Sequence, residues 1–207
     1  MKQAEIILVG GGGHCHSCID VIEQQGRYRI AGIVDLPERV GQEVLGYPVI
    51  GTDDDLPRLA EEYRYFLITL GQIKSPARRM ALFHRLKGLG VQLPTIVSSR
   101  AYVSHHARVG EGTIIMHGAL VNAGARVGSN CIINTFCLLE HDASVGDHCH
   151  ISTASVINGG TAVAEGTFVG SNTVTREGIR IGANCIVGGG VVVLQSVPNG
   201  TIYTGKK

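Results

Sequence analysis

The sequence predicts two folded parts: an α/β, Rossmann-like βαβαβ domain over residues 1–96 and a parallel β-helix over residues 97–207. Three observations lead to this prediction. Strand and helix patterns alternate in the first part, an aliphatic residue recurs at every sixth position in the second, and glycine accounts for 29 of the 207 residues. That share is about twice the ~7% usual in proteins, and it lacks the G-X-Y period of collagen.

The first part alternates short apolar runs with helical patterns. Buried strands are predicted at 6–9, 30–34 and 66–70, and helices at 14–25, 53–63 and 77–87. This alternation implies a small parallel sheet with right-handed crossovers. The helical patterns end before Pro94, which places the domain boundary near that residue.

The second part repeats with a period of six. Of the seventeen positions spaced by six from Val97 to Val193, sixteen hold an aliphatic residue, and Thr175 is the exception. A mostly small residue follows four places later in the hexads, at Ala101, Ala107, Thr113, Ala119, Ala125, Cys131, Cys137, Ala143 and Cys149. A period of six fits neither a flat strand nor an α-helix. It fits a short strand plus a corner, so that three hexads form one coil of 18 residues.

This coil gives a place to the cysteines and to many glycines. We expect the cysteines of the small inward position to fill the core as free thiols: Cys131, Cys137, Cys149 and Cys185. We expect the glycines that directly follow an aliphatic residue to form tight corners: Gly110, Gly128, Gly146, Gly170, Gly182 and Gly188.

Composition excludes several classes of protein. The 18 Lys and Arg residues are balanced by 17 Asp and Glu residues, whereas proteins that bind nucleic acid or membrane surfaces usually show a basic surplus. No apolar run reaches the ~18 residues of a membrane span, and the N-terminal segment predicts a strand, not a signal peptide. We therefore expect a cytoplasmic protein. The cluster His14-Cys15-His16-x-Cys18 has no second ligand pair, so no metal site is expected.

Six motifs add a resemblance to a known family. They are G-x-G-G-H at Gly10–His14, Asp35 after the second predicted strand, Gly46–Gly51, Asn134-Thr135, Glu140-His141-Asp142 and Gly146–Ile151. With the six-residue repeat, they make the chain resemble the hexapeptide-repeat sugar acetyltransferases of the sialic-acid O-acetyltransferase type, above all the UDP-4-amino-sugar N-acetyltransferases of the bacillosamine pathway. The resemblance implies a left-handed β-helix, homotrimers with active sites between neighbouring prisms, and acetyl-CoA as donor. The ending Thr204–Lys207 departs from the G-x-P-A-K usual in that family.

His141 is the candidate general base. It stands two places after inward Leu139, so it points outward, and an imidazole suits proton removal near pH 7. Asp142 or Glu140 could orient its ring. One coil of 18 residues further on lies Gly159, whose N–H could stabilise an oxyanion. The alternatives are a solvated surface histidine and a plain turn glycine. No cysteine is placed outward beside His141, so we expect direct attack without an acyl-enzyme.

The remaining candidate residues bind ligands. We assign acetyl-CoA to His150, Gly159, Ser171 and Gly189, of which His150 matches a family histidine near the acetyl group. The resemblance implies that the nucleotide sugar contacts Gly12, Gly13, His14 and Asp35, and Asn134 could hold the sugar. Glycines before a helix can cradle phosphate, but they can also form a simple tight turn. The four histidines His105, His106, His117 and His148 are expected to be surface imidazoles.

The predicted function is acetyl-CoA-dependent N-acetylation of a nucleotide-linked amino sugar. O-acetylation of a sugar such as sialic acid uses the same base and remains an alternative. A non-catalytic, structural β-helix is the second alternative, and an NAD site is disfavoured because G-x-G-G-H is not the dinucleotide fingerprint. The sequence does not specify the sugar, the nucleotide, the acyl chain or the pathway.

Overall fold

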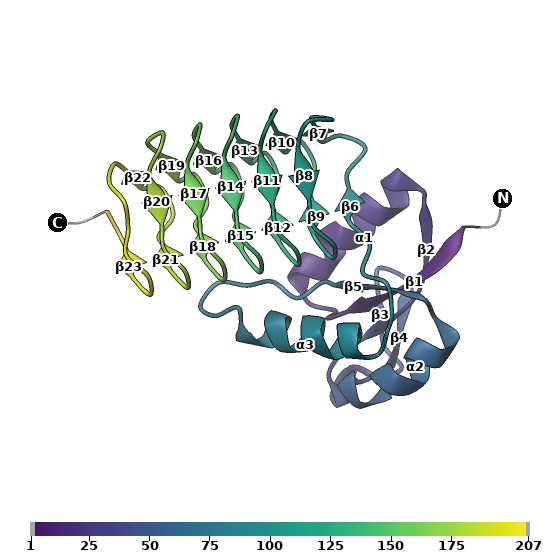
Figure 1. Ribbon diagram of the computed structural model, residues 1–207. Helices are drawn as coiled ribbons and strands as arrows, with labels where there is room; N and C mark the ends of the chain where they lie inside the picture. Colours follow the sequence, from purple (N-terminus) through teal and green to yellow (C-terminus); the bar gives the residue numbers. More distant parts are fainter. Residues whose placement is uncertain (1–2, 206–207) are drawn as a thin grey trace.

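The computed structural model describes residues 3–205 and contains an α/β domain packed against a long parallel β-helix, which we call the prism (Figure 1). The helical elements of the α/β domain are α1 (Gly13–Gln25), η1 (Pro37–Arg39), η2 (Asp53–Asp55), α2 (Leu56–Glu62) and α3 (Ala77–Gly88). Its strands are β1 (Ala4–Val9), β2 (Tyr28–Val34), β3 (Glu43–Val44), β4 (Tyr47–Gly51) and β5 (Tyr65–Ile68). The three predicted strands and three predicted helices are thus all present.

The sheet of the α/β domain has the order β3-β4-β2-β1-β5, and it is parallel except for the β3–β4 hairpin. Helix α1 packs on one face, while α2 and α3 pack on the other. The hairpin was not predicted. Its turn places Leu45 and Gly46 at positive φ (49° and 82°), and Pro48 interrupts the strand pattern of β4.

The prism consists of two-residue strands, and from β6 to β22 the second residue of each is the expected inward position. They are β6 (Ile96–Val97), β7 (Tyr102–Val103), β8 (Arg108–Val109), β9 (Ile114–Ile115), β10 (Leu120–Val121), β11 (Arg126–Val127), β12 (Ile132–Ile133), β13 (Leu138–Leu139), β14 (Ser144–Val145), β15 (His150–Ile151), β16 (Val156–Ile157), β17 (Ala162–Val163), β18 (Phe168–Val169), β19 (Val174–Thr175), β20 (Arg180–Ile181), β21 (Ile186–Val187), β22 (Val192–Val193) and β23 (Ile202–Tyr203). From β6 to β22 the pairing joins residues 18 apart, as in Val103 with Val121, whereas β21 pairs with β23 at a spacing of 16, as in Ile186 with Ile202. The predicted coil is therefore confirmed.

Three parallel sheets form the sides of the prism: the β6–β23 sheet, the β7–β22 sheet and the β8–β20 sheet. The chain visits them in this order in each coil. The inward aliphatic residues and the four predicted cysteines form one continuous buried core, and all six cysteines are free and buried. The exceptional Thr175 is also buried, at 1% exposure.

The role predicted for one set of glycines was wrong. Glycines directly after an aliphatic residue do not adopt left-handed backbone; they allow close contact between coils. A Cβ on Gly110 would lie 2.6 Å from the carbonyl carbon of Gly128. The left-handed corner residue comes two places later, and it is glycine in some coils, such as Gly112, but Asn130, Phe136 or Asp142 in others.

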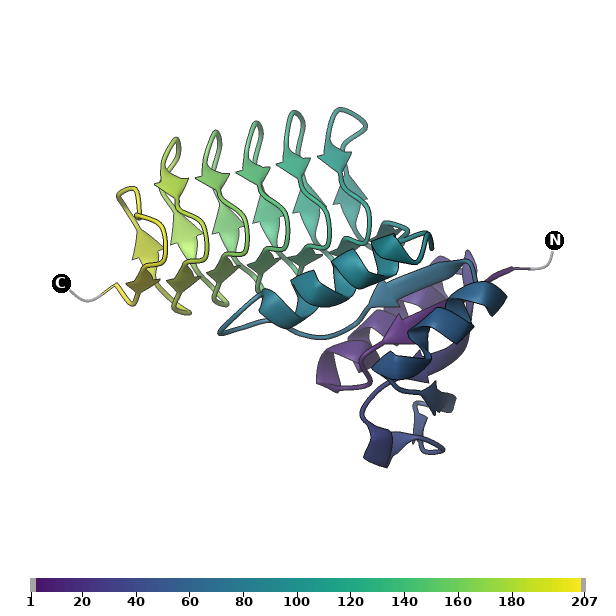
Figure 2. The same cartoon turned by 60° about the horizontal axis from the view of Figure 1, so that its bottom comes forward.

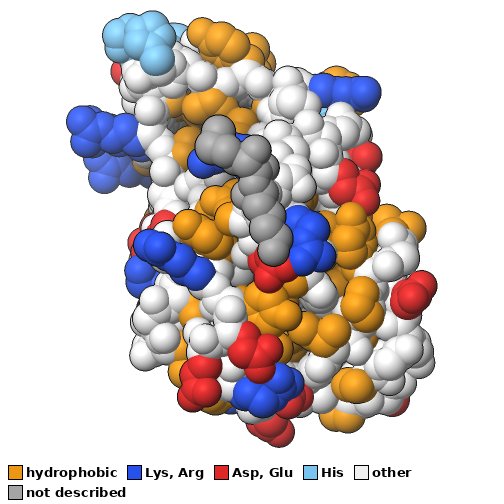
Figure 3. All heavy atoms as spheres, turned by 90° about the vertical axis from the view of Figure 1, so that its right-hand side faces the viewer, with side chains coloured by type: hydrophobic (Ala, Val, Ile, Leu, Met, Phe, Trp, Pro, Cys, Tyr) orange, Lys and Arg blue, Asp and Glu red, His pale blue; other side chains and the backbone are white. Residues whose placement is uncertain are grey.

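The α/β domain lies against the N-terminal coils of the prism, with α3 beside the prism in both ribbon views (Figures 1 and 2). Outward-facing Ile96, Ile114 and Ile132 of the β6–β23 sheet share one core with α1 and β1. On the face shown in Figure 3, acidic and basic side chains are interspersed among hydrophobic ones. In residues 3–205, no helix is long and apolar enough to cross a membrane.

Gly110→Ala should lower the free energy of unfolding by about 1–3 kcal/mol, because the added methyl group would overpack two coils. Chemical denaturation measures the change. Gly88→Ala is the matched control: a Cβ there meets nothing within 4 Å, so it should be neutral or stabilise by up to about 1 kcal/mol. Equal destabilisation by both changes would contradict this account of coil spacing.

Candidate functional site

Two hollows lie on different corners of the prism. The larger, of about 850 Å³, is bounded by α1, the loop after β5, and the corner between the β6–β23 and β7–β22 sheets. We call that corner the groove corner; it includes Thr135, Thr153, Ser171 and Gly189. The other hollow, of about 690 Å³, lies at the next corner, which holds His141 and Gly159 and which we call the His141 corner. The β7–β22 sheet separates the two corners.

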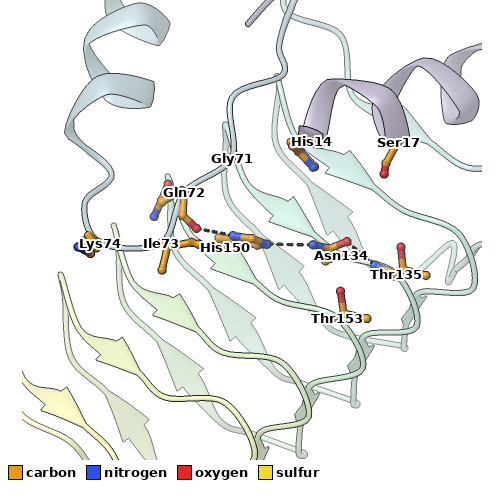
Figure 4. A pocket seen from close by; sticks show the side chains of 10 residues that line it. All are labelled: His14, Ser17, Gly71, Gln72, Ile73, Lys74, Asn134, Thr135, His150 and Thr153. Atoms are coloured by element: carbon orange, nitrogen blue, oxygen red, sulfur yellow. Dashed lines mark hydrogen bonds between the residues drawn. The ribbon is translucent and has the colours of Figure 1, made fainter. Parts of the chain in front are cut away.

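His150 is fixed by two hydrogen bonds at the larger cavity (Figure 4). Its Nδ1 lies 2.6 Å from the carbonyl oxygen of Gln72. Because a carbonyl only accepts, Nδ1 carries the proton, and Nε2 accepts from Asn134 Nδ2 at 3.1 Å. Burial, followed by the positive charge of Arg79, lowers the pKa of His150 to about 4. The imidazole is therefore neutral at physiological pH.

His14 lies across the same cavity, in the first turn of α1, with its ring centroid 6.4 Å from that of His150. Burial lowers its pKa to about 3, and Arg79 and His150 add to this effect. Its Nε2 is buried without a hydrogen-bond partner among residues 3–205. An orphaned ring nitrogen beside a cavity is suited to meet a polar group of a ligand.

The glycine loop divides into a closed and an open half. Gly10 and Gly11 are packed: a Cβ on Gly11 would lie 2.7 Å from Asp35 Oδ2. Gly12 and Gly13, at the N-terminus of α1, have nothing within 4 Å of a Cβ position. This open half exposes the end of the helix, where backbone N–H groups favour an anion.

The structure brings only some of the predicted substrate residues together. His14 and Asn134 line the large cavity. Asp35 instead lines a separate hollow of about 130 Å³, where its carboxylate lies 3.1 Å from Arg39 Nη1. Gly12 and Gly13 lie at the start of α1 but line neither hollow.

His141 is paired with Asp142. Its Nδ1 lies 3.0 Å from Asp142 Oδ2, and its side chain is 67% exposed. Glu140 has a different role: its Oε2 accepts the His141 backbone N–H at 3.2 Å and the Asn122 side-chain amide at 2.9 Å. Of the two predicted carboxylates, Asp142 is therefore the one at the imidazole, and Glu140 shapes the backbone.

Gly159 lies directly against the imidazole of His141, as predicted from the 18-residue coil. A Cβ there would be 2.7 Å from His141 Nε2, so only glycine leaves this space free. Ala123 and His141 hold the same place in earlier coils. The Ala123 N–H donates to Asn122 Oδ1, and the His141 N–H donates to Glu140 Oε2. Among the described residues, the Gly159 N–H donates no such bond.

Thr175 explains why this N–H stays open. Its hydroxyl accepts the Asn158 backbone N–H at 3.0 Å, and its carbonyl accepts the Asn158 side-chain amide at 2.7 Å. The Asn158 side chain is therefore held away from the following N–H, unlike Asn122 one position before Ala123. The exceptional residue of the repeat thus shapes the corner at Gly159.

Ser171 and Gly189, both predicted to bind acetyl-CoA, continue the groove corner beyond Thr153. Ser171 Oγ lies 2.9 Å from Ser152 Oγ, and a Cβ on Gly189 would lie 3.1 Å from the Ser171 carbonyl oxygen. Ser171 and Gly189 therefore belong to the groove corner. Gly159, which was predicted to bind acetyl-CoA with them, belongs to the His141 corner. No residue lines both hollows.

Sequence reasoning missed Gln72, Ile73, Lys74 and Ser17, which line the large cavity. The loop after β5 carries no motif, and its place depends on contacts with residues 76–94 positions away. Ser17 could have been found as the residue one helical turn after His14. Among residues 3–205, no group of three or more His, Cys, Asp or Glu side chains is placed to hold a metal ion.

Two of the histidines expected at the surface are engaged instead. His148 is 6% exposed and its Nδ1 lies 2.9 Å from Asn130 Nδ2. His117 joins two elements, with Nε2 2.7 Å from Asp20 Oδ2 on α1 and Nδ1 2.7 Å from Ser98 Oγ. His117 connects α1 with the prism, and His148 contacts Asn130, which bonds Arg79 of α3. These long-range contacts have no local sequence signal.

Comparison with known proteins identifies the family. Residues 5–86 match the PglD N-terminal domain. The chain is similar to a solved structure of PerB from Caulobacter crescentus, in complex with CoA and GDP-perosamine: 33% identity, 95% of this chain and 91% of that chain covered, TM-score 0.87. The chain belongs to the hexapeptide-repeat sugar acetyltransferases. The predicted resemblance and the predicted fold, with its left-handed β-helix, are confirmed.

Two further solved structures share the fold of this chain. The acetyltransferase domain of PglB from Neisseria gonorrhoeae, in complex with acetyl coenzyme A, is 27% identical over 98% of this chain and 97% of that chain, with a TM-score of 0.89. WeeI from Acinetobacter baumannii shares the fold, at 21% identity over 98% of this chain and 97% of that chain, with a TM-score of 0.85. A comparison with curated proteins found no match.

The two neutral histidines predict acid sensitivity. The pKa of His14 and His150 is about 3 and 4 in the folded chain, against 6.5 for an ordinary histidine. Below pH 6.5 the unfolded chain therefore binds more protons, and the fold loses stability as the pH falls. At pH 5 each of these histidines should lower the free energy of unfolding by up to about 2 kcal/mol relative to pH 8.

Urea unfolding between pH 5 and pH 8 measures this dependence. In His14→Gln the change in unfolding free energy between pH 8 and pH 5 should be smaller by the contribution of His14, up to about 2 kcal/mol. An unfolding free energy that is constant over this range would contradict the neutral, buried state of both rings.

Proposed function

We propose that the chain is an acetyl-CoA-dependent N-acetyltransferase of a nucleotide-linked amino sugar. The observation that carries the proposal is the pair His141–Asp142 with its imidazole against Gly159. The likeness to a perosamine N-acetyltransferase with bound CoA and GDP-perosamine supports an amine acceptor over a sugar hydroxyl. We place the reaction in the cytoplasm, where acetyl-CoA is available.

The geometry of the His141 corner fits direct transfer. The Nδ1–H of His141 donates a hydrogen bond to Asp142, and this leaves the Nε2 lone pair of His141 free to act as general base. Nε2 removes a proton as the sugar amine attacks the thioester carbonyl. The Gly159 N–H donates to the oxyanion of the tetrahedral intermediate. The C–S bond then breaks, and the imidazolium returns its proton to the leaving CoA sulfur.

The α/β domain provides the acceptor side. The open N-terminus of α1, at Gly12 and Gly13, is placed to receive the phosphates of the nucleotide sugar. His14 and Asn134 face the adjoining cavity, where the sugar and the acyl end of acetyl-CoA would meet. Ser171 and Gly189 extend the groove corner away from the α/β domain, along which the rest of the CoA would lie.

A second copy of the chain is needed to join these parts. The outward side chains of the β7–β22 sheet are all apolar: Tyr102, Leu120, Leu138, Val156, Val174 and Val192. The β8–β20 sheet instead presents Arg108, Arg126, Ser144, Ala162 and Arg180. A continuous apolar face of this kind indicates a protein interface.

We infer that the β7–β22 sheets of three copies face a threefold axis. In a closed ring, one edge of each sheet meets the opposite edge of the next. The two edges of this sheet are the groove corner and the His141 corner. His141 and Gly159 of one copy would therefore face His150 and Asn134 of its neighbour, which completes the site between subunits in a homotrimer.

His141→Ala should lower kcat by roughly 10²–10⁴, the contribution of a general base, with the trimer unchanged. Steady-state acetylation of nucleotide-linked amino sugars, followed by thiol release, measures this. His105→Ala is the matched control, because His105 holds the same place two coils earlier, and it should keep full activity. Wild-type kcat in His141→Ala would remove the base assignment.

Mixing two inactive variants tests whether the site lies between copies. His141→Ala lacks the base, and Thr153→Trp fills the large cavity from the groove corner. After co-refolding in equal amounts, about a quarter of the sites should combine an intact His141 corner with an intact groove. Activity should return to that level. No recovery in mixed trimers would show that both parts come from one copy.

A further inference from the structure

Arg79 of α3 is a buried cation without an anion. It is 2% exposed, and among the described residues it forms no salt bridge. Burial lowers the pKa of its guanidinium to about 10. An unpaired charge in a protein interior is costly, so a residue of this kind needs a specific reason to be there.

Four hydrogen bonds show what Arg79 holds together. Its Nη1 donates to the carbonyl oxygens of Ile68 at 3.1 Å and Leu70 at 2.6 Å. Its Nη2 donates to Asn130 O at 3.1 Å and to Asn130 Oδ1 at 2.9 Å. The fork of the guanidinium therefore ties the end of β5 and the loop after it to a corner of the prism.

That loop carries the carbonyl that orients His150. Gln72 follows Leu70 by two residues, and its carbonyl oxygen accepts the His150 Nδ1 proton. The Gln72 side chain also donates to His148 O at 2.9 Å, so a second hydrogen bond fixes the same residue to the prism. With the Nδ1 proton held there, the lone pair on Nε2 is directed to Asn134 and the cavity.

We propose that Arg79 is a positioning residue for acyl transfer: by holding the 68–70 backbone on Asn130, it fixes the Gln72 carbonyl and thereby the Nδ1–H tautomer and ring orientation of His150. The positive charge of Arg79 also helps to keep the imidazoles of His14 and His150 neutral, because it opposes their protonation. The effect on catalysis rests on the proposed function, but the effect on His150 does not.

Two variants separate this role from simple stabilisation. Arg79→Lys keeps the charge, but its single ammonium cannot span the carbonyls of Leu70 and Asn130 as the guanidinium does. Asn130→Gly removes the side chain that accepts from Arg79 and keeps the left-handed backbone (φ 55°), which glycine adopts at the same corner in Gly112 and Gly166. Asn184→Gly is the matched control, at the same corner three coils away.

The direct test is the ¹⁵N spectrum of labelled histidine, with the His150 signals assigned by their loss in His150→Gln. Wild type and Asn184→Gly should show His150 protonated at Nδ1 alone, whereas Arg79→Lys and Asn130→Gly should show a mixture of tautomers. In the same two variants kcat should fall by roughly 10–100-fold, and KM for acetyl-CoA should change by less than about threefold.

The outcomes are distinct. If both folded variants keep the wild-type His150 signals and kcat and lose only thermal stability, Arg79 is a structural residue and the proposal is wrong. If the tautomer changes but the wild-type protein acetylates no nucleotide-linked amino sugar, the proposed function fails and the positioning of His150 stands. Should Arg79→Lys not fold, Asn130→Gly decides by the same two readouts.

Discussion

The stacking of residue i on residue i+18 is the constraint on which the rest of the molecule depends. Backbone hydrogen bonds between coils fix this register from β6 to β22. Each corner position thereby becomes a column of side chains, and a site is made by choosing residues within a column. His141 has Gly159 as its neighbour because the register puts it there, and the imidazole occupies the space that a side chain at Gly159 would need.

The same constraint separates the two parts of the proposed reaction. Residues of one column share a corner, so Thr153 and Ser171 stay on the groove corner while His141 and Gly159 stay on the next one. Neither corner can reach the other within a coil, because the β7–β22 sheet lies between them. The apolar face of that sheet then has a functional consequence: its association with other copies is what would bring the two corners together.

The α/β domain depends on a different kind of contact. Its apolar contact with the prism, through α1 and Ile114, is supplemented by buried polar bonds from Arg79 and Gln72. Apolar contacts are non-directional, whereas these hydrogen bonds set a single position for the loop after β5. The orientation of His150 follows from that position, which is why we assign the role of Arg79 to the site as well as to the fold.

The sequence predicted what depends on periodicity. The coil, the inward cysteines and the neighbourhood of His141 and Gly159 all follow from counting by six or eighteen. It did not predict the β3–β4 hairpin, because a left-handed Leu45 has no turn signature. The sequence also assigned the corner role to the glycines one position after the aliphatic residue. Glycine is required there by close packing between coils and not by a positive φ.

Within the site, the sequence did not predict what depends on backbone conformation or on contacts between distant segments. Asp142 and Glu140 could not be told apart from the sequence, because the left-handed backbone at Asp142 (φ 59°) decides which carboxylate reaches the ring. Arg79 and Gln72 lie in segments without a motif, and their partners on the prism are 51 to 94 positions away. Contacts of this range depend on how the two domains pack, which no local pattern records.

We have proposed that the reacting groups come from two copies of the chain. A crystal structure of the protein with CoA and a nucleotide-linked amino sugar tests it most directly. We predict a threefold assembly in which the CoA sulfur lies between His141 of one copy and the His150–Asn134 groove of the next. A CoA sulfur placed beside His150 with no His141 from a neighbouring copy near it would contradict the account.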